Sequence, residues 1–215
     1  MSRQYRLIDK WLSEVDHALR TASSRNNRGQ RANPAEEKGA EATELSDEER
    51  TLAAGLMRVN HSGEIAAQAL YKGQSLLARN KALWEHLQEA ADEEVDHLAW
   101  CEDRLRELGS QPSRLAPFWY AGSYTMGALA GLAGDKWSLG FIEETEKQVT
   151  AHLESHLERL PEKDLRSRQI IEQMREDEME HAESAHKAGA APLPEPIKRA
   201  MTGIAKVMTT TSFRW

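Results

Sequence analysis

Residues 83–108 read LWEHLQEAADEEVDHLAWCEDRLREL. Apolar residues recur in this stretch every three or four positions, which is the spacing of one face of an α-helix. That face runs through Leu83, Leu87, Ala90, Glu94, His97, Cys101, Leu105 and Leu108. Glu94 and His97 therefore interrupt an apolar stripe and point into the core. Because residues three apart lie on the same side of a helix, both side chains can reach one small ion.

The same Glu-x-x-His spacing occurs at three other places: Glu14/His17, Glu178/His181 and Glu183/His186. The spacing alone is a weak signal, because most such pairs in a highly charged chain are neighbours on a solvent-facing side of a helix. Only Glu178 and His181 repeat the context of the first pair, on a line with Ile171, Met174, Ala185 and Ala188. We interpret the other two pairs as exposed.

Each of the two helices is preceded by another helical pattern that supplies a further glutamate. Glu146 lies on the apolar line of its helix, with Leu139, Ile142, Val149 and Leu153, whereas Glu143 and Glu144 lie off that line. A carboxylate buried without a partner is costly, so a core glutamate needs a compensating charge.

In the first half of the chain the corresponding glutamate is Glu64, one turn from Asn60 and Ala67 on a less apolar stripe. The two halves then match as a repeat, because Glu94 follows Glu64 by 30 residues and Glu178 follows Glu146 by 32.

Two helices that each carry a Glu-x-x-His pair, facing two helices that each contribute a glutamate, form the two-metal site of ferritin-like bundles. We predict that the metal ligands are Glu64, Glu94, His97, Glu146, Glu178 and His181. Four carboxylates balance the charge of two ferrous ions, and this donor set suits iron or manganese better than structural zinc. The predicted fold is an all-α, ferritin-like four-helix bundle.

The rest of the sequence is consistent with an all-α chain of three parts. We expect an amphipathic helix in residues 1–20, a flexible linker of low apolar content over 21–45, and the di-iron domain over 46–215. Within the domain, a capping box at Ser46 opens the first helix, Asp135 caps a later one, and Gly109 and Pro161 mark ends. The predicted helices cover 46–78, 81–108, 115–134, 135–160, 162–188 and a last one to residue 215.

Composition excludes some classes of function. The net charge of −7 argues against a nucleic-acid-binding protein, which usually has a basic surface. The single cysteine, Cys101, excludes an internal disulfide and fits a reducing compartment. Charged residues interrupt the N-terminal apolar residues, so we expect no secretory signal.

Three motifs resemble those of the demethoxyubiquinone hydroxylases of ubiquinone biosynthesis: Arg58-Val-Asn-His-Ser-Gly-Glu64, Asp92-Glu-Glu94-Val-Asp-His97 and Glu176-Asp-Glu-Met-Glu-His181. The resemblance runs from about residue 47 to the C-terminus, and its first motif is the most specific. Carried over position by position, the family's ligands fall on the same six residues, with Glu146 preferred over Glu143. The resemblance also implies a role near the metals for His152, whereas Leu153 stands where many members have tyrosine. We expect Asn60, one turn before Glu64, to lie near the metals as well.

The resemblance implies an O2-dependent monooxygenase, a 3-demethoxyubiquinol 3-hydroxylase. Its cofactor would be two iron ions, its substrate a polyprenyl demethoxyubiquinol of the 2-methoxy-6-polyprenyl-benzoquinol type, and its electron donor NADH. The sequence has no Gly-x-Gly-x-x-Gly motif, so we expect no Rossmann-type nucleotide site.

A polyprenyl quinol resides in the bilayer, so its enzyme must touch the membrane. Residues 115–134 carry no charge but contain too many small residues for a good spanning helix. We expect quinone access and membrane contact at Phe118, Trp119, Tyr120, Tyr124 and Met126. The last helix carries Lys198, Arg199, Lys206 and Arg214 with no acidic residue after Glu195, which suits an anionic lipid surface. The expected location is peripheral, on the cytoplasmic face of a bacterial inner membrane.

Other interpretations stay open. Residues 115–134 can instead belong to the core or to an interface between subunits. The whole chain can be a ferritin- or rubrerythrin-like protein that handles iron or peroxide, or a helical interaction protein whose Glu–His pairs bind no metal. Association with further copies of the chain, or with other ubiquinone-biosynthesis proteins, is not encoded in any motif.

Overall fold

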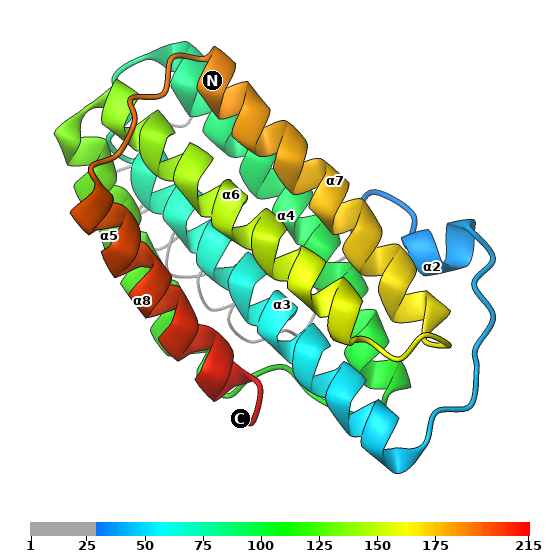
Figure 1. Cartoon of the computed structure of the whole chain (residues 1–215). Coiled ribbons are helices and arrows are strands. Elements are labelled where there is room, and N and C mark those ends of the chain that lie inside the picture. The colour runs from blue at the N-terminus through cyan, green and yellow to red at the C-terminus, as the bar shows by residue number, and fades with distance from the viewer. Residues whose placement is uncertain (1–28) are drawn as a thin grey trace, which may run out of the picture.

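The computed structural model describes residues 29–215, and this part of the chain contains seven helices and no strand (Figure 1). The helices are α2 (Pro34–Glu37), α3 (Asp47–Ser75), α4 (Lys81–Glu107), α5 (Ala116–Ala133), α6 (Asp135–Arg159), α7 (Leu165–Lys187) and α8 (Glu195–Ser212). The all-α prediction is confirmed. The helix predicted within residues 1–20 lies outside the described residues.

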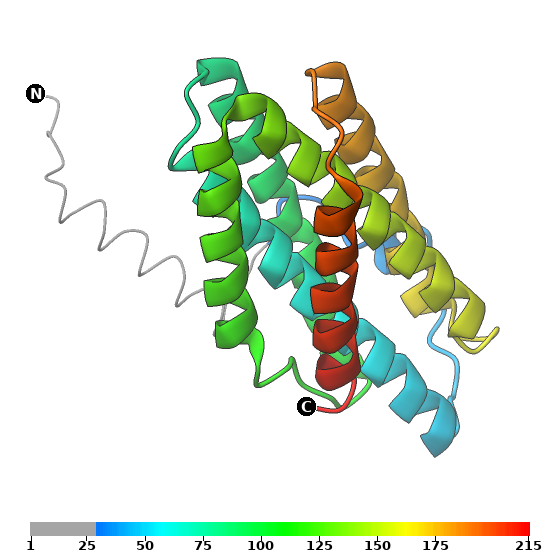
Figure 2. The same ribbon diagram turned by 60° about the vertical axis from the view of Figure 1, so that its left-hand side comes forward.

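Four long helices form the bundle. The helix α3 pairs with α4, α6 pairs with α7, and the two pairs meet through α3 against α6 and α4 against α7. The helix α5 packs along α3, and α8 crosses α3 and α6, so both lie on the side of the bundle away from α7 (Figures 1 and 2). The bundle therefore has one side covered by two extra helices.

Local signals in the sequence set the ends of the helices. The predicted capping box opens α3, because Ser46 accepts from the backbone of Glu49 at 3.3 Å and the Glu49 side chain accepts from the backbone of Ser46 at 2.8 Å. The helix α4 stops before Gly109, which has a φ of 69°. Asp135, predicted to be a cap, is instead the first residue of α6, because Gly134 with a φ of 108° takes the cap position.

Small residues explain how α5 sits on α3. A Cβ atom on Gly127 would lie 2.2 Å from the backbone oxygen of Leu70, and one on Gly73 would lie 2.2 Å from that of Tyr124. The two backbones can approach this closely only because glycines face each other. The apolar side chains of α5 are consequently turned outward, and Phe118, Leu129 and Leu132 are 72%, 60% and 60% exposed.

No helix among residues 29–215 is both long and apolar enough to cross a bilayer. The expectation that residues 115–134 are a poor spanning segment agrees with this finding.

Residues 29–45 run along the bundle and contain the short helix α2, which packs against α7. Asn33 caps this helix by accepting from the backbone of Ala35 at 3.0 Å, and the side chains of Ala35 and Leu45 are buried in the core. The sequence predicted a linker over 21–45 and did not anticipate this packing, because the segment has too few apolar residues to show a helical period.

Candidate metal centre

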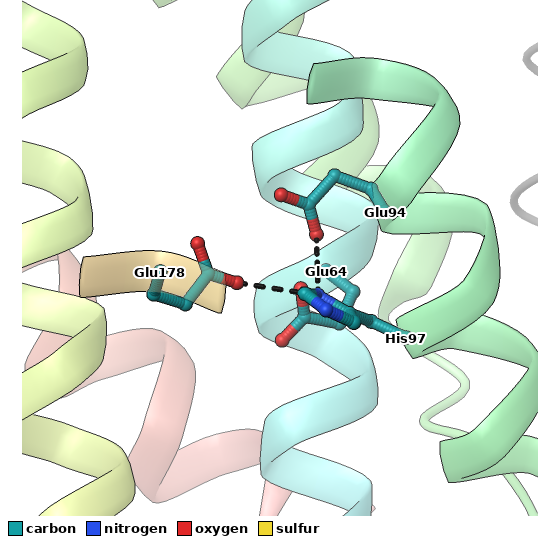
Figure 3. Close-up of side chains that lie close together, drawn as sticks. All are labelled: Glu64, Glu94, His97 and Glu178. Carbon is teal, nitrogen blue, oxygen red and sulfur yellow. Dashed lines mark hydrogen bonds and ion pairs between the residues drawn. The ribbon is translucent and has the colours of Figure 1, made fainter. Parts of the chain in front are cut away.

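Four buried side chains converge in the middle of the bundle (Figure 3). Glu64 comes from α3, Glu94 and His97 from α4, and Glu178 from α7, and their ligand atoms all lie within 4.8 Å of one another. Glu94, His97 and Glu178 each interrupt an apolar stripe, whereas Glu64 lies on the less apolar stripe of its helix, and the bundle packs these faces together. The arrangement has the donor atoms of a transition-metal site.

His97 points one ring nitrogen into the carboxylates and the other away from them. Its Nδ1 lies 3.5 Å from Glu64, 3.3 Å from Glu94 and 3.3 Å from Glu178. Its Nε2 lies 2.9 Å from Oδ2 of Asp177 on α7. If Nδ1 is left free for a metal, Nε2 carries the hydrogen atom and donates a hydrogen bond to Asp177.

His181 on α7 has the same arrangement. Its Nδ1 lies 3.2 Å from Glu178 and 3.9 Å from Glu94, and its Nε2 lies 2.8 Å from Oε2 of Glu93 on α4. The two outer contacts are reciprocal, since each histidine is held by a carboxylate from the opposite helix. A carboxylate behind an imidazole fixes its tautomer and orientation, as in many metal sites.

Glu146 on α6 is fully buried beside this cluster, and the hydroxyl of Tyr71 on α3 donates to it. Glu143, one turn earlier, points instead to Lys147 at 2.5 Å and to His186 at 3.2 Å near the surface. The structure thus brings Glu146 and not Glu143 to the cluster.

Of the pairs interpreted as exposed, Glu183/His186 is on the surface, with side chains 64% and 71% accessible. Glu14/His17 lies outside the described residues.

The protonation of the cluster reflects charges crowded into a dry core. Burial and the neighbouring Glu178 raise the pKa of both Glu94 and Glu146 well above the ordinary value. Burial alone would lower the pKa of the histidines, but hydrogen bonds to Asp177 and Glu178 raise that of His97, and those to Glu178 and Glu93 raise that of His181 to about 11. Without a bound cation, the raised pKa values favour the protonated forms of two carboxyls and two imidazoles of the cluster, and these protons offset the negative charge of the remaining carboxylates.

The side chains fit a pair of divalent ions. Oε1 of Glu94 and Oε2 of Glu146 are buried and have no hydrogen-bond partner among residues 29–215, although such groups normally find one. These orphaned oxygens, together with two imidazole Nδ1 atoms aimed the same way, are what a pair of metal ions would satisfy.

A cavity of about 500 Å³ adjoins the cluster. Every residue of its lining belongs to α3, α5, α6 or α8, and none to α4 or α7. Among the six predicted ligands only Glu64 lines it, together with mostly apolar residues such as Leu70, Val149 and Met208. The cavity is of the size and character of a small-molecule pocket.

The other predicted site residues are distributed unevenly. Asn60 and His152 both line the cavity. His156 lies behind them and contacts both: its Nδ1 is 2.7 Å from Oδ1 of Asn60, and its ring centroid is 4.0 Å from that of His152. Burial and the neighbouring His152 lower the pKa of His156 to about 2, so this ring is neutral.

Of the five residues predicted for quinone access, only Met126 lines the cavity. Phe118 is exposed, Tyr120 is buried against Leu98 and stacks with Tyr124, and Trp119 donates to Ser212 at 3.0 Å.

Four residues near the cluster were not predicted: Asp177, Glu93, Tyr71 and His156. A signal for the first two was present, because each directly precedes the glutamate of a Glu-x-x-His pair. Tyr71 falls on the same helix face as Glu64, seven residues later, but an aromatic side chain on that face is what an ordinary core position would also show.

Comparison with known proteins agrees with this geometry. A family model described as ubiquinone biosynthesis protein COQ7 matches residues 51–212. The chain is 55% identical over 208 residues to a 3-demethoxyubiquinol 3-hydroxylase of Polynucleobacter asymbioticus, covering 97% of this chain and 99% of that protein. It is 56% identical over 208 residues to the enzyme of the same name in Chromobacterium violaceum, covering 97% and 100%. The corresponding protein of Acinetobacter baumannii is 54% identical over 211 residues, with 98% and 99% covered.

Proposed function

Since the chain belongs to the family of ubiquinone biosynthesis protein COQ7, we propose that it is a 3-demethoxyubiquinol 3-hydroxylase, which adds a hydroxyl group to a quinol ring in ubiquinone biosynthesis. The observation that carries the proposal is the buried Glu–His cluster at the edge of an apolar cavity. A redox metal held beside a dry pocket can hydroxylate a ring C–H bond, and this chain has both the donor atoms to hold such a metal and the pocket beside them.

Two iron ions are the cofactor that fits the family and the cluster. We assign Glu64, Glu94, His97, Glu146, Glu178 and His181 as their ligands. When bound, the irons would activate O2 so that one oxygen atom enters the ring. The protein's part is to hold the imidazoles through Asp177 and Glu93 and the Glu146 carboxylate through Tyr71.

The substrate is a demethoxyubiquinol with a polyprenyl tail, and the cavity is its binding site in this proposal. The ring lies at the end lined by Glu64, where Asn60 and His152 supply the polar groups of an otherwise apolar wall. The tail extends between α6 and α8, past Met201 and Met208. An apolar wall excludes water from the reacting ring and favours the tail by burial.

Reducing equivalents come from NADH and the second substrate is O2, as the resemblance to demethoxyubiquinone hydroxylases implies. Electrons from NADH must enter without a Rossmann-type site, because the sequence lacks its glycine motif.

The enzyme works as a peripheral protein on the cytoplasmic face of a bacterial inner membrane. Its lipid-facing surface is formed by exposed apolar side chains of α5 and α8: Phe118, Leu129, Leu132, Ile204, Val207 and, at the C-terminus, Trp215. Basic residues of α8 and the C-terminus flank them and favour anionic headgroups. A substrate dissolved in the bilayer then reaches the cavity beside α8 without crossing water.

Neither alternative function gains support. A ferritin- or rubrerythrin-like protein does not need an apolar cavity against the cluster. A helical interaction protein without metal does not explain buried carboxylate oxygens that lack partners in the part of the chain that the structure describes.

The test is a deletion of the gene followed by extraction and mass analysis of the quinones. We expect demethoxyubiquinone to accumulate and ubiquinone to be lost, and the full-length gene to restore ubiquinone where a Glu178→Ala gene does not. Normal ubiquinone in the deletion strain would refute the proposal.

A further inference from the structure

The segment before the bundle reaches the outside of the candidate metal centre. Residues 29–31, which we call the strap, lie against α4 and α7 on the side opposite the cavity. The backbone N–H groups of Gln30 and Arg31 both donate to Oδ1 of Asp96, the residue before His97. A Cβ atom on Gly29 would lie 2.8 Å from the same oxygen, so the strap is in close contact with α4.

Arg31 extends from the strap to the two side chains that hold His97. Its Nη2 lies 2.7 Å from Oδ2 of Asp177, the same oxygen that lies 2.9 Å from His97 Nε2. Its guanidinium group also stacks over Trp100, with Cζ 4.8 Å from the ring centroid. The Trp100 ring in turn packs against the imidazole of His97, with 5.3 Å between centroids.

We propose that Arg31 is a positioning residue for the candidate ligand His97, acting through Asp177 and Trp100. The guanidinium is a planar fork that pairs with the carboxylate while it stacks on the indole, so it fixes both at once. Asp177 is held from its other oxygen by Gln173 at 3.0 Å. Without Arg31 the carboxylate keeps that neighbour but loses the cation that sets its position between α4 and α7.

His181, the other imidazole of the cluster, provides an internal contrast. Its orienting carboxylate, Glu93, is half-exposed and has no arginine at ion-pair distance among the described residues. The hydrogen bond to His181 is the largest cause of the lowered pKa of the Glu93 carboxyl, and Arg31 acts on Glu93 only through its charge at longer range, as one of the smaller causes. The strap therefore makes direct contacts with one half of the metal pair, and its loss is expected to affect mainly the metal ion beside His97.

The inference rests on the proposed metal site and is tested with the full-length protein, stripped of metal and titrated with Co²⁺ under anaerobic conditions. We expect Arg31→Gln to weaken Co²⁺ binding ~3- to 10-fold, less than the 10- to 100-fold usual for loss of a direct outer partner. The visible absorption of the bound Co²⁺ should change as well, because the imidazole is less well oriented. With iron and substrate, kcat should fall while the KM for the quinol stays constant, since the cavity is on the opposite side.

Arg166→Gln is the matched control. Arg166 also fastens the N-terminal segment, donating to the backbone oxygen of Ala40 at 3.1 Å, and it pairs with Glu107 at 2.6 Å, but it contacts no residue of the cluster. We expect this variant to lower the melting temperature and to leave Co²⁺ affinity and absorption unchanged. Metal binding unchanged by Arg31→Gln, or changed equally by Arg166→Gln, would overturn the inference alone. A wild-type protein that takes up no Co²⁺ would overturn the proposed function together with it.

Discussion

The two sides of the candidate metal centre are built in different ways. On the α4–α7 side, each helix supplies a glutamate and a histidine, and each histidine is held from behind by a carboxylate of the opposite helix. On the α3–α6 side, each helix supplies one glutamate, and the space behind Glu64 is the cavity. The first side is polar and densely connected, whereas the second is apolar and hollow.

This difference separates two tasks that compete for the same space. Ligands hold a metal well when their outer atoms are also bound, and that leaves no room for a substrate. A substrate needs an open approach, and among the described residues the cavity supplies one at Glu64, a carboxylate ligand on a helix that contributes no histidine ligand. We infer that the α4–α7 side orients the metal ions and the α3–α6 side presents them to the quinol.

The largest effect is expected from removing Glu146, the candidate ligand on the α3–α6 side that does not line the cavity. Glu146→Ala should reduce hydroxylation by at least ~100-fold, because a direct ligand matters more than an outer partner. Iron content and quinol hydroxylation of the purified protein measure it. Glu143→Ala is the control one turn away, and it should retain most of the activity because the ion pairs of Glu143 within the described part of the chain are with Lys147 and His186, away from the cluster. The reverse result would assign the ligand of α6 to Glu143.

A smaller effect is expected from filling the hollow side while leaving every ligand in place. Ala66 lines the cavity from α3, next to Ile65 and two residues after Glu64. Ala66→Phe should lower kcat/KM for the quinol ~10-fold or more, because a bulky ring occupies the space of the substrate. Iron content should stay at the wild-type level.

The control for this variant is Ala121→Phe, an equal change at an exposed position of α5. It should leave kcat/KM unaltered. Loss of iron in Ala66→Phe, with activity per iron unchanged, would show that the two sides are not independent.

The sequence predicted the polar side better than the hollow one, for a physical reason. Glu94, His97, Glu178 and His181 each interrupt an apolar stripe of one helix, and a stripe is a local property that a single sequence reveals. The same argument distinguished Glu146 from Glu143 before any contact was known. The four-helix bundle followed from the same stripes, because their number and order leave few ways to bury them.

Contacts between helices could not be obtained in this way. That Asp177 reaches His97, and that Arg31 reaches Asp177, depends on how far one helix is displaced along another and on where an apolar-poor segment docks. The cavity is harder still to predict, because it is a space left by α3, α5, α6 and α8 together. The aromatic residues of α5 illustrate this limit: glycines turned toward α3 direct Phe118 outward instead of into the cavity.

The smallest effect expected is on stability, and it tests whether protons replace the metal on the polar side. In the metal-free fold the pKa of His181 is raised to about 11 and that of His97 is also raised, so their contribution to stability is complete below about pH 6.5 and is lost as the pH rises toward those values. The raised pKa values of Glu94 and Glu146 act in the same direction, because the fold also keeps their protons above the ordinary carboxyl range. Metal-bound ligands are deprotonated, so the loaded protein does not lose this stability.

Chelation should therefore lower the melting temperature more at pH 8.5 than at pH 6.5, by a difference of a few °C, at ~2–4 °C per kcal/mol for a chain of this size. Scanning fluorimetry of the iron-loaded and chelated protein at both pH values measures the difference. The Glu146→Ala protein, measured in parallel, should respond less to the chelator if its site is lost. A chelator effect that is equal at both pH values, or larger at pH 6.5, would mean that the cluster does not exchange protons for metal. No chelator effect at either pH would mean that the polar side is a set of buried ion pairs without a cation to hold.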